Sequence, residues 1–390
     1  MASGPRVLVV ATKCPWPPTD GGRLVLAETL RAVADAGAEV TLVCPQHEDS
    51  AGAAHSARNG VEAANHVVVA RRALPWIYTL LRPGTPATIV RQTNDASLEA
   101  VERLVAERPF DVAHAEQLQA MPMLAPARQR GIPIVLRAQN VESDLWTAAA
   151  SAMPLAAPWL LFQAALLRRW EGRAVASAAA TAALTETDSR RLSNLASGRG
   201  EVVHLAAPFP ERLEAGDPLP GTPALAIAAG GWSPNHDGAR WFVERVWPLV
   251  LDRLPAAQLH LFGADGKRLP RAASAHRRAA ESSSLFPTEG MHVVPVRVAS
   301  GVRMKILEAW SRGVPVVATE AAAAGLEDGA ESALLRESDP AALALAIEKL
   351  AHDPDRRKAL VVAGRRQLAR HHDPSAIGAR WLELYRYVAR

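Results

Sequence analysis

The sequence predicts an α/β protein made of two doubly wound, parallel-sheet domains of the Rossmann-like kind. The chain has 390 residues, more than a single hydrophobic core normally serves. Short apolar runs rich in β-branched residues alternate with segments whose apolar residues recur at helical spacing. A stretch dense in proline and glycine, residues 207–222, separates two such series. We therefore expect an N-terminal domain over 1–206, a proline-rich linker, a C-terminal domain over 223–370, and a last helix over 371–390 that crosses back to the N-terminal domain.

The first series opens with a βαβ unit. Arg6–Ala11 predicts a strand, Leu24–Ala36 a helix, and Glu39–Cys44 a second strand. Strand, helix and strand within about forty residues imply parallel pairing and a right-handed crossover. The other elements expected in this domain are a helix at Val101–Arg108 and strands at Val67–Val69, Asp111–Ala115, Ile134–Leu136 and Ala180–Thr185.

The second series repeats this alternation without repeating the sequence. The expected strands are Leu225–Ala229, Gln258–Phe262, His292–Val296 and Val314–Thr319. The expected helices are Gly238–Leu254, Met304–Ser311, Pro340–His352, Asp355–Arg370 and Ser375–Val388. The last of these gathers its apolar residues on one face, which indicates a helix packed against a core. The Ser- and Ala-rich stretch Ala272–Met291 contains no recognisable strand.

Composition indicates an ordinary globular protein, with 49% hydrophobic and 22% charged residues. Cys14 and Cys44 are the only cysteines, too few for a disulfide framework and not at metal-ligand spacing. We expect both to be small buried apolar residues in a reducing compartment. Residues 1–6 lead directly into the first strand without the pattern of a signal peptide. A cytoplasmic location follows as the expectation.

The charge balance suits an anionic partner. A net charge of +4 favours a nucleotide diphosphate or an acidic lipid surface. Nucleic acid is not expected, because basic residues are scattered and only three Tyr and six Phe could stack on bases. The longest apolar stretch, Pro154–Leu167, ends at Arg168 and Arg169 and is shorter than the ~20 residues that span a bilayer. We expect a helix covered by protein, and peripheral contact with a membrane surface is the alternative.

The segment Pro295–Trp310 carries the strongest functional signal. A strand ends, a small turn containing Ser300, Gly301 and Val302 follows, and a helix starts. The free backbone N–H groups and the positive dipole end of such a helix bind phosphate. This turn is therefore a candidate phosphate site.

Charged side chains extend the same signal. Arg303 and Lys305 place positive charge in a first turn where the helix dipole favours acids, so an anionic ligand would explain them. Glu308 lies two turns beyond Ser300 on the same helix face, where its carboxylate would accept both hydroxyls of a ribose. The alternative is an ordinary surface helix with a solvated glutamate.

This segment resembles the C-terminal signature of the retaining nucleotide-sugar glycosyltransferases of family four, the group 1 type, which have the GT-B fold. Other segments that resemble the family, in the same order, are Pro17–Arg23, Arg137–Ser143, Gly231–Phe242, Leu254–Ala264 and Ala324–Leu335. The resemblance spans almost the whole chain and is stronger in the C-terminal domain. It implies two domains facing across a cleft and sugar transfer, with retention, from a nucleoside-diphosphate sugar that acts as substrate rather than cofactor.

The resemblance also implies roles for particular residues. The family commonly has a Glu-x7-Glu pattern, in which the later Glu holds the ribose and the earlier one contacts the donor sugar. Glu308 matches the later position, whereas Ser300 stands at the earlier one, so a hydroxyl and backbone amides must replace a carboxylate. The donor-binding candidates are Gly21, Gly22, Gly231, His236, Ser300, Gly301, Val302, Arg303, Lys305 and Glu308. The candidate catalytic groups are His114, Arg303 and Lys305.

Acceptor-binding candidates lie at the ends of N-terminal strands. His114 and Glu116 end one expected strand, and Asn140 and Glu142 follow another. Open parallel sheets bind ligands at the carboxyl ends of their strands. A lone histidine is more often structural, so a structural His114 stays open. A small molecule or a glycan is the expected acceptor.

No metal site is expected. Asp353 and Asp355 flank Pro354 in an Asp-x-Asp motif that resembles a metal-binding pair. We interpret this motif as the N-terminal cap of the helix that follows. Arg303 and Lys305 would neutralise the leaving diphosphate instead.

The predicted function is therefore metal-independent sugar transfer to a small-molecule, cell-surface glycan or lipid-linked acceptor. A nucleotide-sugar epimerase or hydrolase on the same scaffold and a non-catalytic GT-B-like binding protein are the alternatives. The many Ala and Arg residues are typical of proteins from GC-rich bacterial genomes. Polysaccharide and natural-product biosynthesis both stay open. No pattern in the sequence indicates the sugar or the base of the donor, or the oligomeric state.

Overall fold

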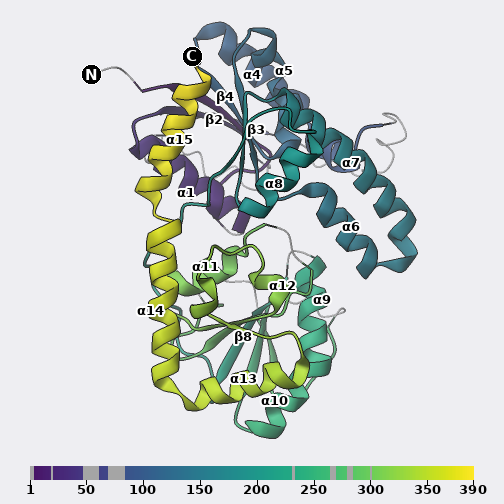
Figure 1. Ribbon diagram of the computed structural model, residues 1–390, viewed down its shortest axis with the longest axis vertical. Helices are drawn as coiled ribbons and strands as arrows, with labels where there is room; N and C mark the ends of the chain where they lie inside the picture. Colours follow the sequence, from purple (N-terminus) through teal and green to yellow (C-terminus); the bar gives the residue numbers. More distant parts are fainter. Residues whose placement is uncertain are drawn as a thin grey trace. The chain divides into compact units, whose positions relative to one another are not determined.

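The computed structural model describes residues 4–18, 21–46, 61–68, 84–230, 233–263, 269–278, 284–298 and 301–390. The chain divides into two compact units. Unit 1 comprises Met1–Pro208 together with Pro374–Arg390, and unit 2 comprises Phe209–Asp373. Each unit is a parallel sheet flanked by helices (Figure 1). The predicted class, α/β with two doubly wound parallel sheets, is confirmed.

Among the described residues, unit 1 has a seven-stranded parallel sheet in the order β3-β2-β1-β4-β5-β6-β7. Its strands are β1 (Arg6–Ala11), β2 (Glu39–Gln46), β3 (Val61–Val68), β4 (Val112–Glu116), β5 (Ile134–Ala138), β6 (Ala180–Ala183) and β7 (Val202–His204). Its helices are α1 (Gly21–Asp35), α3 (Ala87–Gln92), α4 (Asp95–Glu107), η2 (Leu118–Leu124), α5 (Ala125–Gln129), α6 (Glu142–Ala152), η3 (Pro154–Ala156), α7 (Ala157–Ser177), α8 (Glu186–Leu195) and α15 (Pro374–Val388). The strand order reverses between β1 and β4, which is the topological switch point of this sheet.

Alternation along the central strands decides which residues meet beneath the C-terminal helix. Val112 packs into one core cluster and Ala113 into the other, because successive side chains of a strand point to opposite faces. His114 therefore lies on the face that α15 covers. Gly378 lets α15 approach α1 closely, since a Cβ there would lie 2.2 Å from the carbonyl oxygen of Ala32. Figure 1 shows α15 alongside α1, at the opposite end of the chain.

Unit 2 has, among the described residues, a six-stranded parallel sheet in the order β10-β9-β8-β11-β12-β13. Its strands are β8 (Ala224–Ala228), β9 (Gln258–Phe262), β10 (Ala275–Arg278), β11 (Met291–Val294), β12 (Val316–Ala318) and β13 (Leu335–Arg336). Its helices are α9 (Ser233–Trp241), the π-helical η4 (Phe242–Val246), α10 (Trp247–Arg253), α11 (Met304–Ser311), α12 (Glu320–Ala323), η5 (Ala330–Ser332), α13 (Pro340–His352) and α14 (Pro354–His371). The switch point lies between β8 and β11.

Two elements of unit 2 differ from the expectation. The stretch Ala272–Met291, in which no strand was recognised, contains β10, an edge strand paired only with β9 in the described sheet. Its half-exposed polar residues lack the apolar signal that a central strand carries. The single helix expected over Gly238–Leu254 begins earlier, at Ser233, and is interrupted by the π-helical turn of η4.

The proline-rich segment 207–222, expected as a linker, is bonded to unit 2 at several positions. Most of it, from Phe209 onward, belongs to unit 2. The amide of Leu213 donates to the carbonyl of Ser311 at 3.1 Å, and that of Gly216 donates to Phe286 at 2.8 Å. Proline removes backbone donors but leaves carbonyls free to pair, so the segment is fixed by bonds at its other residues.

Candidate functional site

The loops that follow β8 and β11 form the candidate donor site of unit 2. These neighbouring strands flank the switch point, the position at which open α/β sheets bind ligands. Asp237 of α9 pairs with Arg297, which follows β11, at 2.9 Å. This ion pair places the helix that carries His236 next to the segment after β11. Gly231 and Ser300 lie outside the described residues.

Glycines allow the backbone around this turn to pack tightly. A Cβ at Gly238 would lie 2.3 Å from the carbonyl oxygen of Pro295, and one at Gly325 would lie 2.3 Å from that of Gly301. Gly301 itself has a φ of +69°, a conformation that favours glycine. The described parts of the turn are thus held by neighbouring backbone on two sides.

Helix α11 begins at Met304, with Arg303 as its N-cap residue and Lys305 in its first turn. Gly301 and Val302 are buried, and no acidic residue occupies that turn. Glu308 lies about one turn inside α11. Ser300, with which it was expected to share a helix face, lies outside the described residues.

The Glu308 carboxylate is buried and ion-paired. Its side chain is 3% exposed, Lys305 Nζ donates to Oε2 at 2.9 Å, and Arg312 Nε donates to Oε1 at 3.2 Å. Both cations also lie over the ring of Phe286, at 5.3 and 5.5 Å from its centre. The alternative of a solvated surface glutamate is therefore wrong. Lys305 likewise has a partner in this structure, so its position in the first turn does not by itself require an anionic ligand.

In unit 1, Gly21 and Gly22 are the first residues of α1. His114 is not at the end of its strand, as was expected, but is the third residue of β4. It is 1% exposed, its Nδ1 shares a 2.6 Å hydrogen bond with Tyr385 Oη, and its ring stacks on Trp381 at 5.0 Å. Burial lowers the pKa of His114 and favours the neutral ring. Helix α15 thus covers the histidine.

Glu116 is held in a buried network on the same face of the sheet. Its carboxylate lies 3.4 Å from His114 Nε2 and 3.3 Å from Arg137 Nη1, and Gln139 Nε2 donates to it at 2.6 Å. Burial acts to raise the pKa of Glu116, but the Arg137 guanidinium together with His114 and Gln139 outweighs burial and holds this pKa below its ordinary value. Glu116 is therefore an ionised structural centre that ties β4 to β5.

Two glutamines lie at the carboxyl edge beyond this network. Gln117, the first residue after β4, has a φ of +73°, a conformation that costs a non-glycine residue about 1–3 kcal/mol. It accepts from Thr12 at 3.2 Å and donates to Gln139 at 2.9 Å, which joins the loops after β1, β4 and β5. The sequence analysis did not identify Gln117 or Gln139. Their position directly after a strand is the feature that could have indicated a role at the site.

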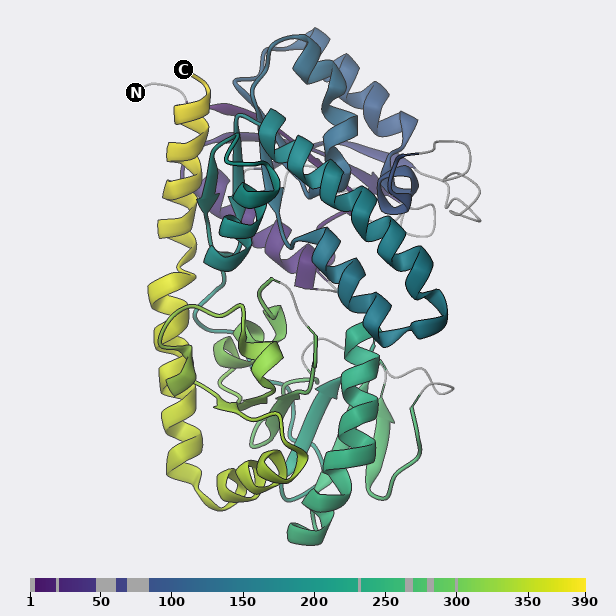
Figure 2. The same ribbon diagram turned by 45° about the vertical axis from the view of Figure 1, so that its right-hand side comes forward.

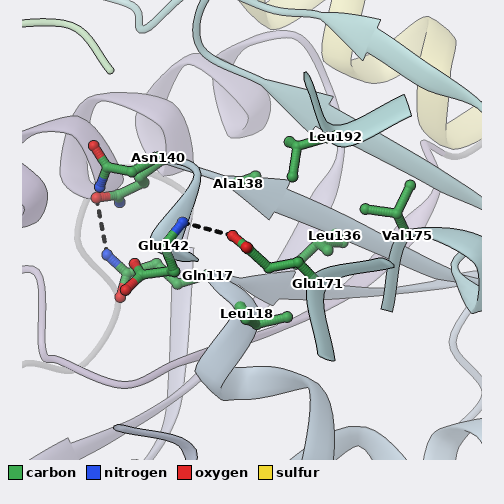
Figure 3. Close-up of a pocket in the computed structure, with 10 residues that line it drawn as sticks. Gln117, Leu118, Leu136, Ala138, Asn140, Glu142, Glu171, Val175 and Leu192 are labelled. Carbon is green, nitrogen blue, oxygen red and sulfur yellow. Dashed lines mark hydrogen bonds between the residues drawn. The ribbon is translucent and has the colours of Figure 1, made fainter. Parts of the chain in front are cut away.

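A pocket in unit 1 contains the other two acceptor candidates. Figure 3 shows Asn140 and Glu142 beside it, with Glu171 pointing toward the start of α6. The pocket is lined by Gln117, Leu118, Leu136, Ala138, Gln139, Asn140, Glu142, Glu171, Val175 and Leu192. The structure thus brings Asn140 and Glu142 together at one pocket, and His114 and Glu116 are not among its lining residues.

Glu171 caps the N-terminus of α6 from a neighbouring helix. Its carboxylate accepts from the amides of Glu142 and Ser143 at 2.5 and 3.1 Å. Burial raises the pKa of Glu171 to about 7 and also raises that of Glu142. The pocket therefore contains two carboxyl groups that keep their protons more readily than usual. Glu171 was missed because it lies in a helix far along the sequence.

The expected cap at Asp353 is confirmed, since its carboxylate accepts from the amide of Arg356 at 2.7 Å at the start of α14. Within the part of the chain that the structure describes, no group of three metal-ligating side chains lies close enough together to hold an ion.

Two family models match successive parts of the chain. The model described as Glycosyl transferase 4-like domain matches residues 20–208, and the one described as Glycosyl transferases group 1 matches residues 223–353. Because these matches fall in both units, they identify the protein as a glycosyltransferase, which is an enzyme. The chain belongs to the group 1 glycosyltransferases. Among curated proteins, no sequence matches this chain.

Solved structures with the GT-B fold resemble the whole chain. Sucrose-phosphate synthase from Thermosynechococcus elongatus has a TM-score of 0.74 at 14% identity, and the match covers 98% of this chain and 99% of that one. HepE from Anabaena, solved in complex with UDP-glucose, has a TM-score of 0.65 at 13% identity, with 98% and 99% covered. A glycosyltransferase from Rickettsia africae has a TM-score of 0.63 at 10% identity, with 99% of each chain covered. At these identities the likeness concerns the fold.

Proposed function

We propose that this glycosyltransferase takes its sugar from a nucleoside-diphosphate sugar bound at the carboxyl edge of the unit 2 sheet. The observation that carries the proposal is the buried Glu308 carboxylate, held by Lys305 and Arg312 in the helix that follows the switch-point strand β11. Each carboxylate oxygen has more than one acceptor site, so Glu308 can accept ribose hydroxyls while it keeps its cations. The complex of HepE with UDP-glucose supports this class of donor.

In this proposal, positive charge at the start of α11 assists departure of the diphosphate. The bond between the anomeric carbon and the diphosphate oxygen breaks, and its electron pair leaves with the diphosphate. An acceptor hydroxyl bonds to that carbon, and its proton passes to an oxygen of the departing diphosphate. Arg303, Lys305 and the N-terminus of α11 stabilise the charge that develops on the leaving diphosphate. We further propose that transfer proceeds with retention and without a metal ion. We also propose a cytoplasmic reaction, because a chain with only two cysteines suits a reducing compartment.

We assign acceptor binding to the carboxyl edge of the unit 1 sheet, beside this small pocket. Asn140, Glu142 and Gln117 lie there and carry the donors and acceptors that hydroxyl groups of a small molecule or a glycan require. The buried His114 and Glu116 hold this region in place through Arg137 and Gln139 and do not touch the acceptor.

Calorimetric titration of nucleoside diphosphates tests the donor site. Glu308→Gln should weaken binding by about 10- to 100-fold, the effect of losing a hydrogen bond to a charged group worth ~1.5–3 kcal/mol. Glu320→Gln, which alters an exposed ion pair in the same unit, is the matched control and should leave the affinity unchanged. Unchanged affinity in a folded Glu308→Gln protein would refute the ribose role. Sugar release from the donor without any acceptor would favour a hydrolase.

A further inference from the structure

The hairpin of α6 and α7 carries an apolar surface that the rest of unit 1 does not cover. Figures 1 and 2 both show the two helices packed side by side and antiparallel. The inner face of α7 is firmly docked: Leu160 and Leu167 are buried, Gln163 accepts from the amide of Ala87 at 2.8 Å, and Trp170 donates to the carbonyl of Gly84 at 3.1 Å. The hairpin is thus fixed along its length by one face.

The other face exposes large apolar side chains at the tip of the hairpin. Leu155 is fully exposed, and Phe162 is 57% exposed. We call the exposed group the apolar tip; its residues are Met153, Leu155, Trp159, Leu161 and Phe162. These are five of the nine large apolar residues exposed in the part of the chain that the structure describes. The expectation that protein covers this helix was wrong for its outer face, and a helix apolar on both faces indicates a further partner.

Basic side chains continue the same surface along α7. Arg168, Arg169 and Arg173 are exposed, about two to three turns beyond Phe162, the last residue of the apolar tip. No acidic residue occurs from Leu145 to Trp170, and the next one, Glu171, is buried and bonded to the start of α6. An apolar surface with tryptophan and arginine beside it, without acidic residues, is the composition of segments that lie at the interface of an anionic membrane.

We propose that the apolar tip and these three arginines dock unit 1 on the surface of an anionic phospholipid bilayer. The apolar side chains would enter the headgroup region, and the guanidinium groups would pair with lipid phosphates. Charge favours lipid over a second copy of the chain, because this surface carries no acidic residue from Leu145 to Trp170 with which a second copy could pair the arginines. None of the described helices is long and apolar enough to cross a bilayer, so the proposed contact is peripheral. The proposal does not depend on the proposed reaction.

Co-sedimentation of the full chain with vesicles tests this contact. The protein should sediment with vesicles that contain phosphatidylglycerol, should bind pure phosphatidylcholine at least about tenfold more weakly, and should lose binding as salt rises. The variant Trp159→Ser with Phe162→Ser, and the variant with Arg168, Arg169 and Arg173 all changed to Gln, should each partition at least about tenfold more weakly.

Matched controls come from unit 2. Val362→Ser with Leu345→Ser removes exposed apolar side chains, and Arg356→Gln with Arg370→Gln removes exposed charge; both should bind vesicles like the unchanged protein. Circular dichroism and nucleoside diphosphate binding confirm that each variant is folded. No binding to anionic vesicles, equal binding to neutral ones, or equal loss in the control variants would overturn the proposal. So would a dimer in vesicle-free sedimentation velocity that Trp159→Ser with Phe162→Ser abolishes. Because no donor or acceptor is added, failure of the transfer assay leaves this result unaffected.

Discussion

Glu308 of unit 2 and Glu116 of unit 1 are both buried carboxylates, but the chain supplies their partners differently. The cations beside Glu308 come from its own helix, three residues before it and four after it. Glu116 depends on Arg137, which lies on the next strand, in a layer closed by Tyr385 from the far end of the chain. The first arrangement follows from local helical spacing, whereas the second exists only when the sheet and α15 have assembled.

This difference decides what each partner contributes. Lys305 is partly exposed, and Arg312 remains beside Glu308 when Lys305 is removed. Arg137 is fully buried, so its loss leaves the Glu116 charge without its guanidinium in a place that water does not reach. The unit 1 network should therefore govern stability, and the unit 2 site should govern reaction.

Arg137→Met provides the largest test of this comparison. It should lower the free energy of unfolding by about 3–5 kcal/mol, the usual result of removing one partner of a buried ion pair. Lys305→Ala should lower it by about 1 kcal/mol or less, since that ion pair is partly exposed. Urea denaturation of both variants measures the difference. Equal losses would remove the distinction between the two sites.

The pH dependence of stability tests Glu171. The folded protein should keep the proton on this carboxyl up to about pH 7, whereas the unfolded chain releases it near the ordinary pKa of 4.5. Protonation therefore favours the folded state fully below pH 4.5, and this advantage disappears as the pH rises through 7. At about 1.4 kcal/mol per pH unit, the loss is on the order of 3 kcal/mol.

Glu171→Gln does not titrate, so its stability relative to the unchanged protein should improve between pH 5 and pH 7.5, a range about as wide as the shift in pKa. Denaturation at the two pH values measures the change. Glu107→Gln, an exposed residue of unit 1 paired with Arg103, is the control and should show no such trend. A constant difference between the unchanged protein and Glu171→Gln would mean that Glu171 titrates near its ordinary pKa.

Arg303→Ala should affect reaction more than stability. Removal of one electrostatic stabiliser of a leaving group typically costs about a hundredfold in turnover. Its melting temperature should change much less than that of Arg137→Met. Arg356→Ala, which removes an exposed arginine of α14 in the same unit, is the control. Normal turnover of Arg303→Ala would move the phosphate site elsewhere, with the donor-binding candidate His236 as the next residue to test.

The smallest expected effect is that of chelation. If Arg303 and Lys305 supply the positive charge, transfer measured in excess chelator should equal transfer without it. Loss of activity that Mg²⁺ or Mn²⁺ restores would contradict the charge assignment. It would also mean that the donor site of unit 2 needs a metal ion in addition to its own side chains. The contrast between the locally built Glu308 site and the Glu116 network would then be weaker.

The sequence determined the elements whose signal is local. Helix α11 has the predicted bounds, Met304–Ser311, because its apolar spacing and its Gly313 stop lie within a few residues. The central strand β1 was also predicted, since a strand buried on both faces is a nearly continuous apolar run. Edge strand β10 was not, because half-exposed residues carry no such pattern. The turn before α11 was recognised for the same local reason, and with it the family.

Only the tertiary structure decided the sites that distant segments form. A sequence places His114 on a strand, but strand alternation and the return of α15 bury it against Trp381 and Tyr385. Glu171 lies on α7, yet its carboxylate caps α6. The exposure of the outer face of α7 could not be predicted for a related reason. When a helix has two apolar faces, the spacing of its apolar residues does not indicate which face packs against the core. Side-chain spacing along one element is fixed by backbone geometry, whereas burial and pairing between elements depend on how they pack.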